Sequence, residues 1–305
     1  MTTQRATSNT VLTDLSRAQA HAPARRIRIR FGRVLLFGLM CLLAVFFFFP
    51  FFWTVMSSLK RIDELNTFPP TWMPKVPQWV NYETVLTSVP FALWTFNTLL
   101  IVVLSTLGTI ITASLVAYSF ARFRYRGRDF IFLLTLGTLM LPAQVTLIPQ
   151  YVLFHRLNLL NTLYPLWLPA WFGGGAFAIF LLRQFIMALP KDLDEAALID
   201  GASYPRIFWQ ILMPLCKPVL ATVCVITVNG VWNDFANQVI YLQKDTIMTL
   251  AVGMNYFHTL PEVGGEPTQH LLLAASVMSI APIVVLFFAT QRYFVQGIVL
   301  SGIKG

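Results

Sequence analysis

The sequence carries little charge for its length. Charged side chains make up 11% of its 305 residues, whereas hydrophobic side chains make up 56%, and the mean hydropathy is +0.66. In a soluble globular domain about 25% of the residues are charged. The composition therefore excludes an ordinary soluble domain and indicates a membrane protein.

Cysteine and histidine are also scarce. The three cysteines, Cys41, Cys216 and Cys224, lie in or beside apolar runs. Their odd number and their position argue against a disulfide framework. The four histidines are scattered along the chain, and no Cys/His spacing suits zinc. We therefore expect no metal site.

Motifs for nucleotide binding and for catalysis are missing. No Walker A stretch, nucleophile elbow or dinucleotide-binding glycine motif occurs. The chain therefore cannot hydrolyse ATP by itself, and we expect it to bind no cofactor. A membrane enzyme would need catalytic carboxylates, histidines or serines clustered at one interface, and no such cluster is seen. We predict that the chain is not an enzyme.

Long apolar runs predict an all-α membrane protein with six transmembrane helices. A helix needs about 20 apolar residues to span a bilayer. The predicted spans are 34–56, 91–120, 130–154, 163–186, 218–242 and 271–293. Pro142 and Pro149 are expected to break the third span. Gly173, Gly174 and Gly175 are expected to permit close packing or a bend in the fourth.

The remaining segments complete the predicted domain organisation. Residues 1–33 are expected to be a disordered basic cytoplasmic tail, and 57–90 an extracytoplasmic loop rich in proline and tryptophan. Residues 91–296 form the predicted membrane core, which includes the loop 187–217, and 297–305 a cytoplasmic tail. The run 34–56 is too long for a signal peptide and no cleavage site follows it, so we interpret it as an uncleaved helix.

The formal charge of +9 is unevenly distributed. With the N-terminus inside, the outer segments hold only Lys60, Arg61, Lys75, Arg156 and Lys244. The inner segments hold Arg5, Arg17, Arg25, Arg26, Arg28, Arg30, Arg33, Arg122, Arg124, Arg126, Arg128, Arg183, Lys191, Arg206, Lys217, Arg292 and Lys304. By the positive-inside rule, this bias puts both termini and the loop 187–217 in the cytoplasm. It also explains the basic charge without a nucleic-acid partner.

Local signals predict two short helices in the loop between the fourth and fifth spans. Asp192 is expected to cap the first helix, with Glu195 completing a capping box. Gly201 is expected to end that helix in a left-handed conformation. Ser203 is expected to cap the second helix, with Pro205 in its first turn.

The same loop carries a long motif. The pattern E-A-A-x(3)-G-x(9)-I-x-L-P is matched by Glu195, Ala196, Ala197, Gly201, Ile211 and Pro214, with Met213 in place of the usual leucine. On these residues the loop resembles the cytoplasmic EAA loop of bacterial ABC-importer permeases. In that family the loop is a coupling helix that docks into a groove on the ATPase, which implies this role for the matched residues and for Asp200. The alternative is a capped connector with no partner, in which Glu195 only completes the cap.

Three further stretches resemble the carbohydrate subgroup of that family: NYETVL at 81–86, WNDF at 232–235 and the C-terminal VQGIVLSGIKG. The resemblance implies half of the transmembrane pathway for a sugar or sugar derivative, in a bacterial inner membrane. It also implies a second permease subunit, two ATPase subunits that bind ATP and Mg, and an extracytoplasmic solute-binding protein. A permease for another small solute, such as an amino acid or peptide, stays open.

Polar side chains inside the predicted spans are candidates for the substrate pathway, because such groups are costly in lipid and usually face a bundle interior or water. They are Asn97, Gln144, Gln150, Asn229, Asn233 and Asp234. Amides donate and accept hydrogen bonds, which suits sugar hydroxyls. The alternative is that they bond neighbouring helices. A secondary transporter would be expected to have inverted repeats and buried ionisable residues at mid-membrane, whereas Asp234 lies near one span end.

Overall fold

The computed structural model describes residues 31–255, 257 and 268–301, and every regular element in this part of the chain is helical. Within it, 4 helices are long and apolar enough to cross a bilayer, or up to 6 if each of two bent helix pairs is one span. The predicted all-α membrane class is confirmed. Residues 1–30 of the predicted N-terminal tail and residues 302–305 of the predicted C-terminal tail lie outside the described residues.

The chain divides into two units, 1–52 and 53–305, which are described separately. The described part of the first unit belongs to α2 (Phe31–Ser58), a continuous 28-residue helix. At 1.5 Å per residue it is about 40 Å long, more than the roughly 30 Å of a hydrocarbon core. The first predicted span, 34–56, therefore lies within one helix.

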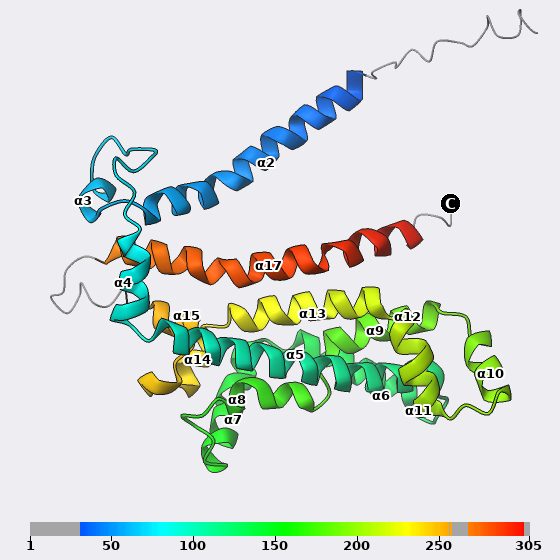
Figure 1. Ribbon diagram of the computed structural model, residues 1–305. Coiled ribbons are helices and arrows are strands. Elements are labelled where there is room, and N and C mark those ends of the chain that lie inside the picture. Colours follow the sequence, from blue (N-terminus) through cyan, green and yellow to red (C-terminus); the bar gives the residue numbers. More distant parts are fainter. Residues whose placement is uncertain (1–30, 256, 258–267, 302–305) are drawn as a thin grey trace, which may run out of the picture. The chain divides into compact units, whose positions relative to one another are not determined.

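The second unit is built around α5 (Phe91–Arg122). Its neighbours are α9 (Ala176–Ala188), α13 (Lys217–Trp232) and η2 (Leu168–Trp171). In Figure 1 α5 runs the length of this bundle, beside α13. Many of its buried residues are small, including Ser105, Gly108, Thr109, Ala113, Ser114, Ala117 and Ala121. Small residues let helix backbones approach closely in a membrane, which explains how one helix packs against three neighbours.

The fourth predicted span is interrupted by its glycines. It consists of α8 (Tyr164–Trp167), η2 and α9, and Gly173, Gly174 and Gly175 between η2 and α9 all have positive φ. A β-carbon on Gly174 would lie 2.7 Å from the Cβ of Ala113 and 2.7 Å from the carbonyl oxygen of Thr109 on α5. The glycines therefore permit both the bend and the close packing that the sequence offered as alternatives.

The third predicted span is bent sharply at its first proline only. The helices α6 (Arg128–Gly137), η1 (Thr138–Met140) and α7 (Ala143–Arg156) replace one straight span, with a 99° angle at the break before Ala143. Leu141 is extended, as expected for a residue that precedes proline. The predicted break at Pro149 is wrong, because α7 continues through it. Proline removes one helical hydrogen bond, and this exposed helix tolerates that loss.

The fifth and sixth predicted spans have different ends from those expected. The helix α13 ends at Trp232, well before residue 242, and α14 (Ala236–Tyr241) follows a short break. At the break the carboxylate of Asp234 accepts a hydrogen bond from the backbone N–H of Asn237, at 3.2 Å. The helix α17 (Gln269–Ser301) continues beyond residue 293, so the predicted tail 297–305 begins inside a helix. Its apolar residues continue past Gln296, which explains the extension.

The segment 57–90 is held by side-chain hydrogen bonds rather than by long helices. It contains α3 (Ile62–Leu65) and α4 (Val80–Ser88). Asn81 donates to the carbonyl oxygens of Ser58 and Lys60, at 2.8 and 3.0 Å, and the Tyr82 hydroxyl lies 2.7 Å from Ser58 Oγ. The first two residues of NYETVL therefore satisfy polar groups at the end of α2, where helix carbonyls have no internal partner. After α14, the chain reaches η4 (Asp245–Ile247) and α15 (Leu250–Met254), which packs on α5.

Candidate coupling site and substrate pathway

The loop between α9 and α13 folds into four short helical elements. They are α10 (Asp192–Ile199), α11 (Tyr204–Ile207), the π-helical turn η3 (Phe208–Leu212) and α12 (Met213–Leu215). The chain then bends by 78° into α13. In Figure 1 α10 stands apart from the long helices at one end of this unit. The predicted pair of short helices is present, and the first of them is the one that projects.

Gly201 ends α10 as the sequence predicts. Its φ is +81°, in the left-handed region. The N–H of Gly201 donates to the carbonyl of Leu198 and the N–H of Ala202 to that of Ala197, at 3.0 and 2.9 Å. This pair of bonds is a Schellman motif. No atom lies within 4 Å of a β-carbon built at Gly201, so the backbone conformation, and not space, requires glycine there.

The predicted capping box is wrong. Lys191 occupies the N-cap position of α10, and no side chain forms a cap hydrogen bond there. Lys191 already has helical φ and ψ, so the helix begins too early for Asp192 to cap it. Asp192, Asp194 and Glu195 instead lie in the first turn, where negative charge is favourable near the N-terminal end of the helix dipole. Ser203 does occupy the N-cap of α11, with Pro205 in the first turn, but its side chain makes no cap hydrogen bond.

Opposite faces of α10 have different surroundings. Ala197 is buried in the apolar cluster that includes Ile207 and Phe208. Glu195 and Ala196 are exposed, and Ile199 is 87% exposed. The motif therefore contributes one residue that fixes α10 to the protein and others that are free to contact a partner. Leu193 and Leu198 on the same helix are also exposed, so α10 presents several apolar side chains to its surroundings.

An ion pair that the sequence did not reveal connects α10 to α5. Arg122 Nε lies 2.6 Å from Asp194 Oδ2, and the two side chains are only 5% and 14% exposed. Arg122 also donates to the carbonyl oxygens of Leu189 and Pro190, at 3.2 and 3.4 Å. One guanidinium group thus holds the end of α5 against both the turn before α10 and the first turn of α10.

The ionisation of Asp194 is disfavoured by its surroundings. Burial raises the pKa of the Asp194 carboxyl above its ordinary value, and Arg122, which acts in the opposite direction, does not fully compensate. Asp194 Oδ1 and Arg122 Nη1 are buried without a hydrogen-bond partner in the described part of the chain. Such a pair fixes geometry without adding much to stability.

The second half of the motif belongs to the packed base of the loop. Ile211 is half-buried within the π-helical turn, and Pro214 lies in the first turn of α12 with its side chain exposed. Phe208 and Leu212, on either side of Ile211, are fully buried. The segment from Gly201 to Pro214 therefore connects the projecting helix α10 to the start of α13.

The predicted pathway residues are not gathered in one place. Asn97 is buried, and its Nδ2 donates to the Met248 carbonyl at 2.9 Å, which matches the alternative role of bonding a neighbouring segment. Asn229 and Asn233 do meet: Asn233 Nδ2 lies 2.8 Å from the carbonyl oxygen and 3.0 Å from the side-chain oxygen of Asn229. Both of these residues are exposed.

The other three pathway candidates lie at separate positions. Gln144 and Gln150 are exposed on α7, Gln144 just after the 99° break. Asp234 is half-buried in the turn before α14 and accepts hydrogen bonds from Asn237. The pathway role of these three residues stays a prediction.

A cavity that sequence reasoning missed lies between α5, α9 and α13. Its volume is about 350 Å³, and its lining includes Thr109, Gly174, Thr227 and Gly230. None of the six predicted pathway residues is among the described residues that line it. The run of three glycines was the sequence signal near it, because Gly174 and Gly175 are part of its lining. No group of His, Cys, Asp or Glu in the described residues could hold a metal ion.

Comparison with known proteins identifies the class of molecule. Residues 110–300 match the family described as binding-protein-dependent transport system inner membrane component. The chain belongs to this family. The matched range includes the whole of the loop from α10 to α12, as well as Asn229, Asn233 and Asp234. It starts after Asn97 and excludes α2.

Curated relatives of this permease are transport components and not enzymes. The chain is 33% identical over 272 residues to the arabinooligosaccharides transport system permease protein AraQ of Halalkalibacterium halodurans, covering 88% of this chain and 94% of the relative. It is 30% identical over 276 residues to the sulfoquinovosyl glycerol transport system permease protein SmoH of Agrobacterium fabrum, covering 90% and 95%. The permease is therefore a membrane subunit of a binding-protein-dependent transporter.

A solved structure has the same fold. The permease resembles a chain in the crystal structure of a bacterial ABC transporter involved in the import of the acidic polysaccharide alginate. The TM-score is 0.75 at 22% sequence identity, over 87% of this chain and 97% of that one. At this identity the likeness establishes the fold alone.

Proposed function

We propose that this permease forms half of the transmembrane pathway of an ATP-driven importer for a sugar or sugar derivative. The observation that carries the substrate class is its likeness, over nearly the full length of both chains, to permeases named for arabinooligosaccharides and for sulfoquinovosyl glycerol. Because the chain has no nucleotide-binding motif, the energy for transport comes from a separate subunit. This permease itself binds no cofactor.

The helix α10 is the coupling helix of this importer. It docks into a groove on an ATPase subunit on the cytoplasmic side, and it carries force between that subunit and the spans. Three features support this role: the exposed Ile199, the buried Ala197 beneath it, and the buried contact between Asp194 and Arg122. Glu195, Ala196 and Asp200 are the exposed polar and small residues available to the ATPase.

The assembly contains a second permease subunit, two ATPase subunits that bind ATP and Mg, and an extracytoplasmic solute-binding protein. Another structure of the alginate transporter is described as a complex with an alginate-bound periplasmic protein, with a TM-score of 0.59 to this chain. The complex lies in a bacterial inner membrane with both termini of this chain in the cytoplasm. The bias of arginine and lysine toward one set of segments supports this orientation.

One face of α13 indicates where the substrate pathway runs. Ile226, Asn229, Gly230 and Asn233 are all exposed and recur at helical spacing, so they share a face that this chain leaves open. Other residues of α13 pack on α5, α9 and α17, and Ile226 and Gly230 also line the cavity between α5, α9 and α13. We assign the open face, with its two amides, to the substrate pathway between this permease and the second permease subunit.

The experiment that tests this function is solute uptake by cells that lack the permease and by the same cells complemented with it. Labelled oligosaccharides and sugar glycosides are compared with amino acids and short peptides. The proposal expects uptake of a saccharide that depends on the permease and on ATP, and that persists when a protonophore collapses the proton gradient under maintained ATP. Restored uptake of amino acids or peptides alone, or uptake driven by the proton gradient, would contradict it.

A further inference from the structure

The turn between α5 and α6 contains arginine side chains that the transport function does not use. The helix α5 ends at Arg122, and α6 begins at Arg128 after Gly127, which has a φ of +81°. Arg124 and Arg126 in this turn are exposed, and neither side chain has a hydrogen-bond or ion-pair partner among the described residues. The turn therefore presents free positive charge at the end of two apolar helices.

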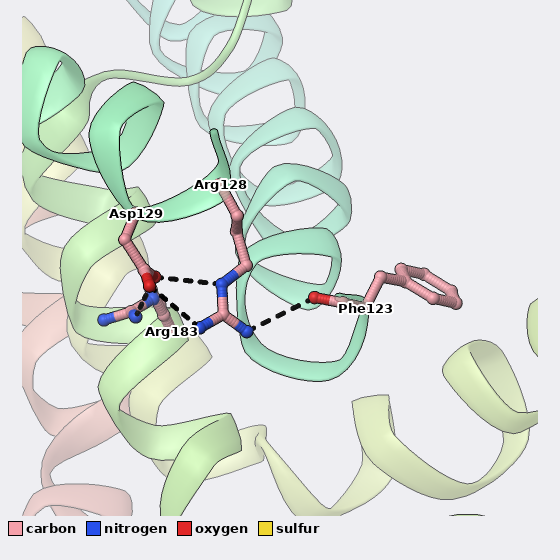
Figure 2. Close-up of polar contacts among 4 residues, drawn as sticks. All are labelled: Phe123, Arg128, Asp129 and Arg183. Atoms are coloured by element: carbon pink, nitrogen blue, oxygen red, sulfur yellow. Dashed lines mark hydrogen bonds and ion pairs between the residues drawn. The ribbon is translucent and has the colours of Figure 1, made fainter. Parts of the chain in front are cut away.

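The acidic side chain of the turn is already engaged. Figure 2 shows Asp129 between two guanidinium groups, with Arg128 on one side and Arg183 of α9 on the other. Arg128 Nε lies 2.9 Å from Asp129 Oδ1, and Arg183 Nη2 lies 3.8 Å from the same oxygen. Arg128 also donates to the carbonyl of Phe123 at 3.3 Å, which closes the turn. Two cations thus neutralise Asp129, and its charge does not cancel those of Arg124 and Arg126.

The positively charged turn surrounds a pocket that opens beside an apolar surface. The pocket has a volume of about 410 Å³ and is lined by Arg124, Tyr125, Gly127, Arg128, Asp129 and Phe130. Phe130 is 65% exposed, and Leu133 and Leu134 on the same helix are also exposed. The polar lining of the pocket suits the headgroup of an amphiphile, and the apolar side chains along α6 suit its hydrocarbon chains.

We propose that this pocket binds the phosphate headgroup of an anionic phospholipid such as phosphatidylglycerol. Arg124 and Arg126 contact the phosphate oxygens, Tyr125 provides a hydroxyl at the interface, and the acyl chains lie along Phe130, Leu133 and Leu134. Guanidinium groups bind phosphate through paired, charge-assisted hydrogen bonds. Basic pockets at the ends of membrane helices are suited to anionic headgroups.

This assignment is narrower than a general preference for arginine on the cytoplasmic side. The positive-inside rule accounts for the number of basic residues but requires no pocket and no lipid selectivity. The ion cluster of Asp129 belongs to the pocket wall, Arg124 lines the pocket, and Arg126 lies beside it in the same turn. A selective lipid site predicts saturable binding that depends on named residues.

The test measures lipid binding to the full-length chain by native mass spectrometry. The purified chain is titrated with phosphatidylglycerol and, separately, with phosphatidylcholine of the same acyl chains. The variant is Arg124→Gln with Arg126→Gln, and the control is Arg156→Gln, an exposed arginine at the far end of α7. Each basic side chain near an anionic lipid contributes about 1 kcal/mol, which corresponds to about a fivefold change in affinity.

We expect wild type to prefer phosphatidylglycerol, the double variant to lose about 25-fold of that preference by the same arithmetic, and the control to keep it. An unchanged preference in the double variant would overturn the proposal. Competition by inorganic phosphate as strong as that of the lipid would show a site for free anions and would also overturn it. Retention of the ATPase subunits is measured in parallel on the assembled transporter. A double variant that keeps lipid selectivity but loses those subunits would also overturn the proposal, because the turn would then be a protein interface.

Discussion

Asp194 shows how a nearly buried ion pair can position a helix at little gain in stability. Its carboxylate and Arg122 are mostly removed from solvent. Among the described residues, Asp194 Oδ1 and both Nε and Nη1 of Arg122 are buried without a hydrogen bond, although Nε lies within the ion pair. Burial raises the pKa of Asp194 in the folded protein. A raised folded-state pKa contributes stability at acid pH that is lost as the pH rises through the unfolded-state and folded-state values. At neutral pH the pair therefore serves the geometry of α10 more than the free energy of unfolding.

The variant Asp194→Asn breaks this pair. We expect its unfolding free energy to fall by about 3 to 5 kcal/mol, because the nearly buried Arg122 keeps its charge without a partner, although the intact pair itself adds little. Its stability should also fall less than that of wild type as the pH rises from acid to neutral. Solute-stimulated ATPase activity should fall as well, since α10 loses its ionic contact with α5. Thermal unfolding at several pH values and solute-stimulated ATPase activity of the assembled transporter are measured in parallel, and an unchanged stimulated rate would contradict the positioning role.

The amides on the open surfaces give a second residue-scale prediction. Asn229→Leu or Gln144→Leu is expected to lower uptake while leaving the complex assembled. Loss of one hydrogen bond to a substrate hydroxyl costs about 0.5 to 1.5 kcal/mol, so the loss of uptake should be partial. The matched control is Asn97→Leu, whose amide bonds the Met248 carbonyl and should affect stability instead. Normal transport by both Asn229→Leu and Gln144→Leu would remove these amides from the pathway.

At this scale, local conformation was predictable and tertiary contacts were not. Gly201 was assigned a left-handed conformation from its position after a helical run, and the structure confirms it. The capping box failed because the backbone of Lys191 is already helical, which a pattern of side chains does not reveal. Arg122 and Asp194 lie far apart in the sequence, so only the packing of α9 and α10 against α5 brings them together.

Among the helices, the contact of α9 with α5 depends most directly on one residue. Gly174→Ala would place a β-carbon against Ala113 and the Thr109 carbonyl, and overpacking of this kind typically costs about 1 to 3 kcal/mol. Gly173→Ala is the control, because its φ is also positive but no atom lies within 4 Å of its β-carbon. We expect Gly174→Ala to lower the midpoint of thermal unfolding more than Gly173→Ala does. Equal midpoints would show that α9 does not need this close approach.

The existence of most helices followed from the sequence, and their ends did not. The helix α5 matches its predicted span within a few residues because a basic turn ends a long apolar run. By contrast, α13 stops at Trp232, before the polar pair Asn233 and Asp234, and Asp234 bonds the backbone of the next short helix, so the fifth predicted span was too long. The break before α7 was predicted from Pro142, but its angle of 99° was not, since a proline between apolar residues is compatible with bends of very different size.

For the whole molecule, the proposed orientation gives a test of topology. After Cys41, Cys216 and Cys224 are replaced, single cysteines are introduced by Ser203→Cys and Thr246→Cys, both at exposed positions. A thiol reagent that does not cross the membrane is then applied to intact cells, with the outer membrane made permeable where there is one. We expect labelling at position 246 and none at 203 until the inner membrane is opened. Labelling of position 203 alone in sealed cells would reverse the proposed orientation and remove α10 from the reach of an ATPase.

The measurement that tests the account most directly is ATP hydrolysis by the assembled transporter, with and without the loaded solute-binding protein, when Gly201 is changed. Gly201→Val places a β-branched residue at a φ of +81°, where a left-handed conformation costs about 1 to 2 kcal/mol. Relief of that strain would break the two cap hydrogen bonds and reorient α10. Gly201→Asn is the control, because asparagine tolerates this conformation.

We expect Gly201→Val to insert in the membrane and to lose most of the stimulated hydrolysis, while Gly201→Asn keeps most of it. Retention of the ATPase subunits is measured in the same preparations, so that failed assembly is recognised. A Gly201→Val complex that holds its ATPase subunits and hydrolyses ATP at the full stimulated rate would contradict the claim that α10 couples this permease to its ATPase.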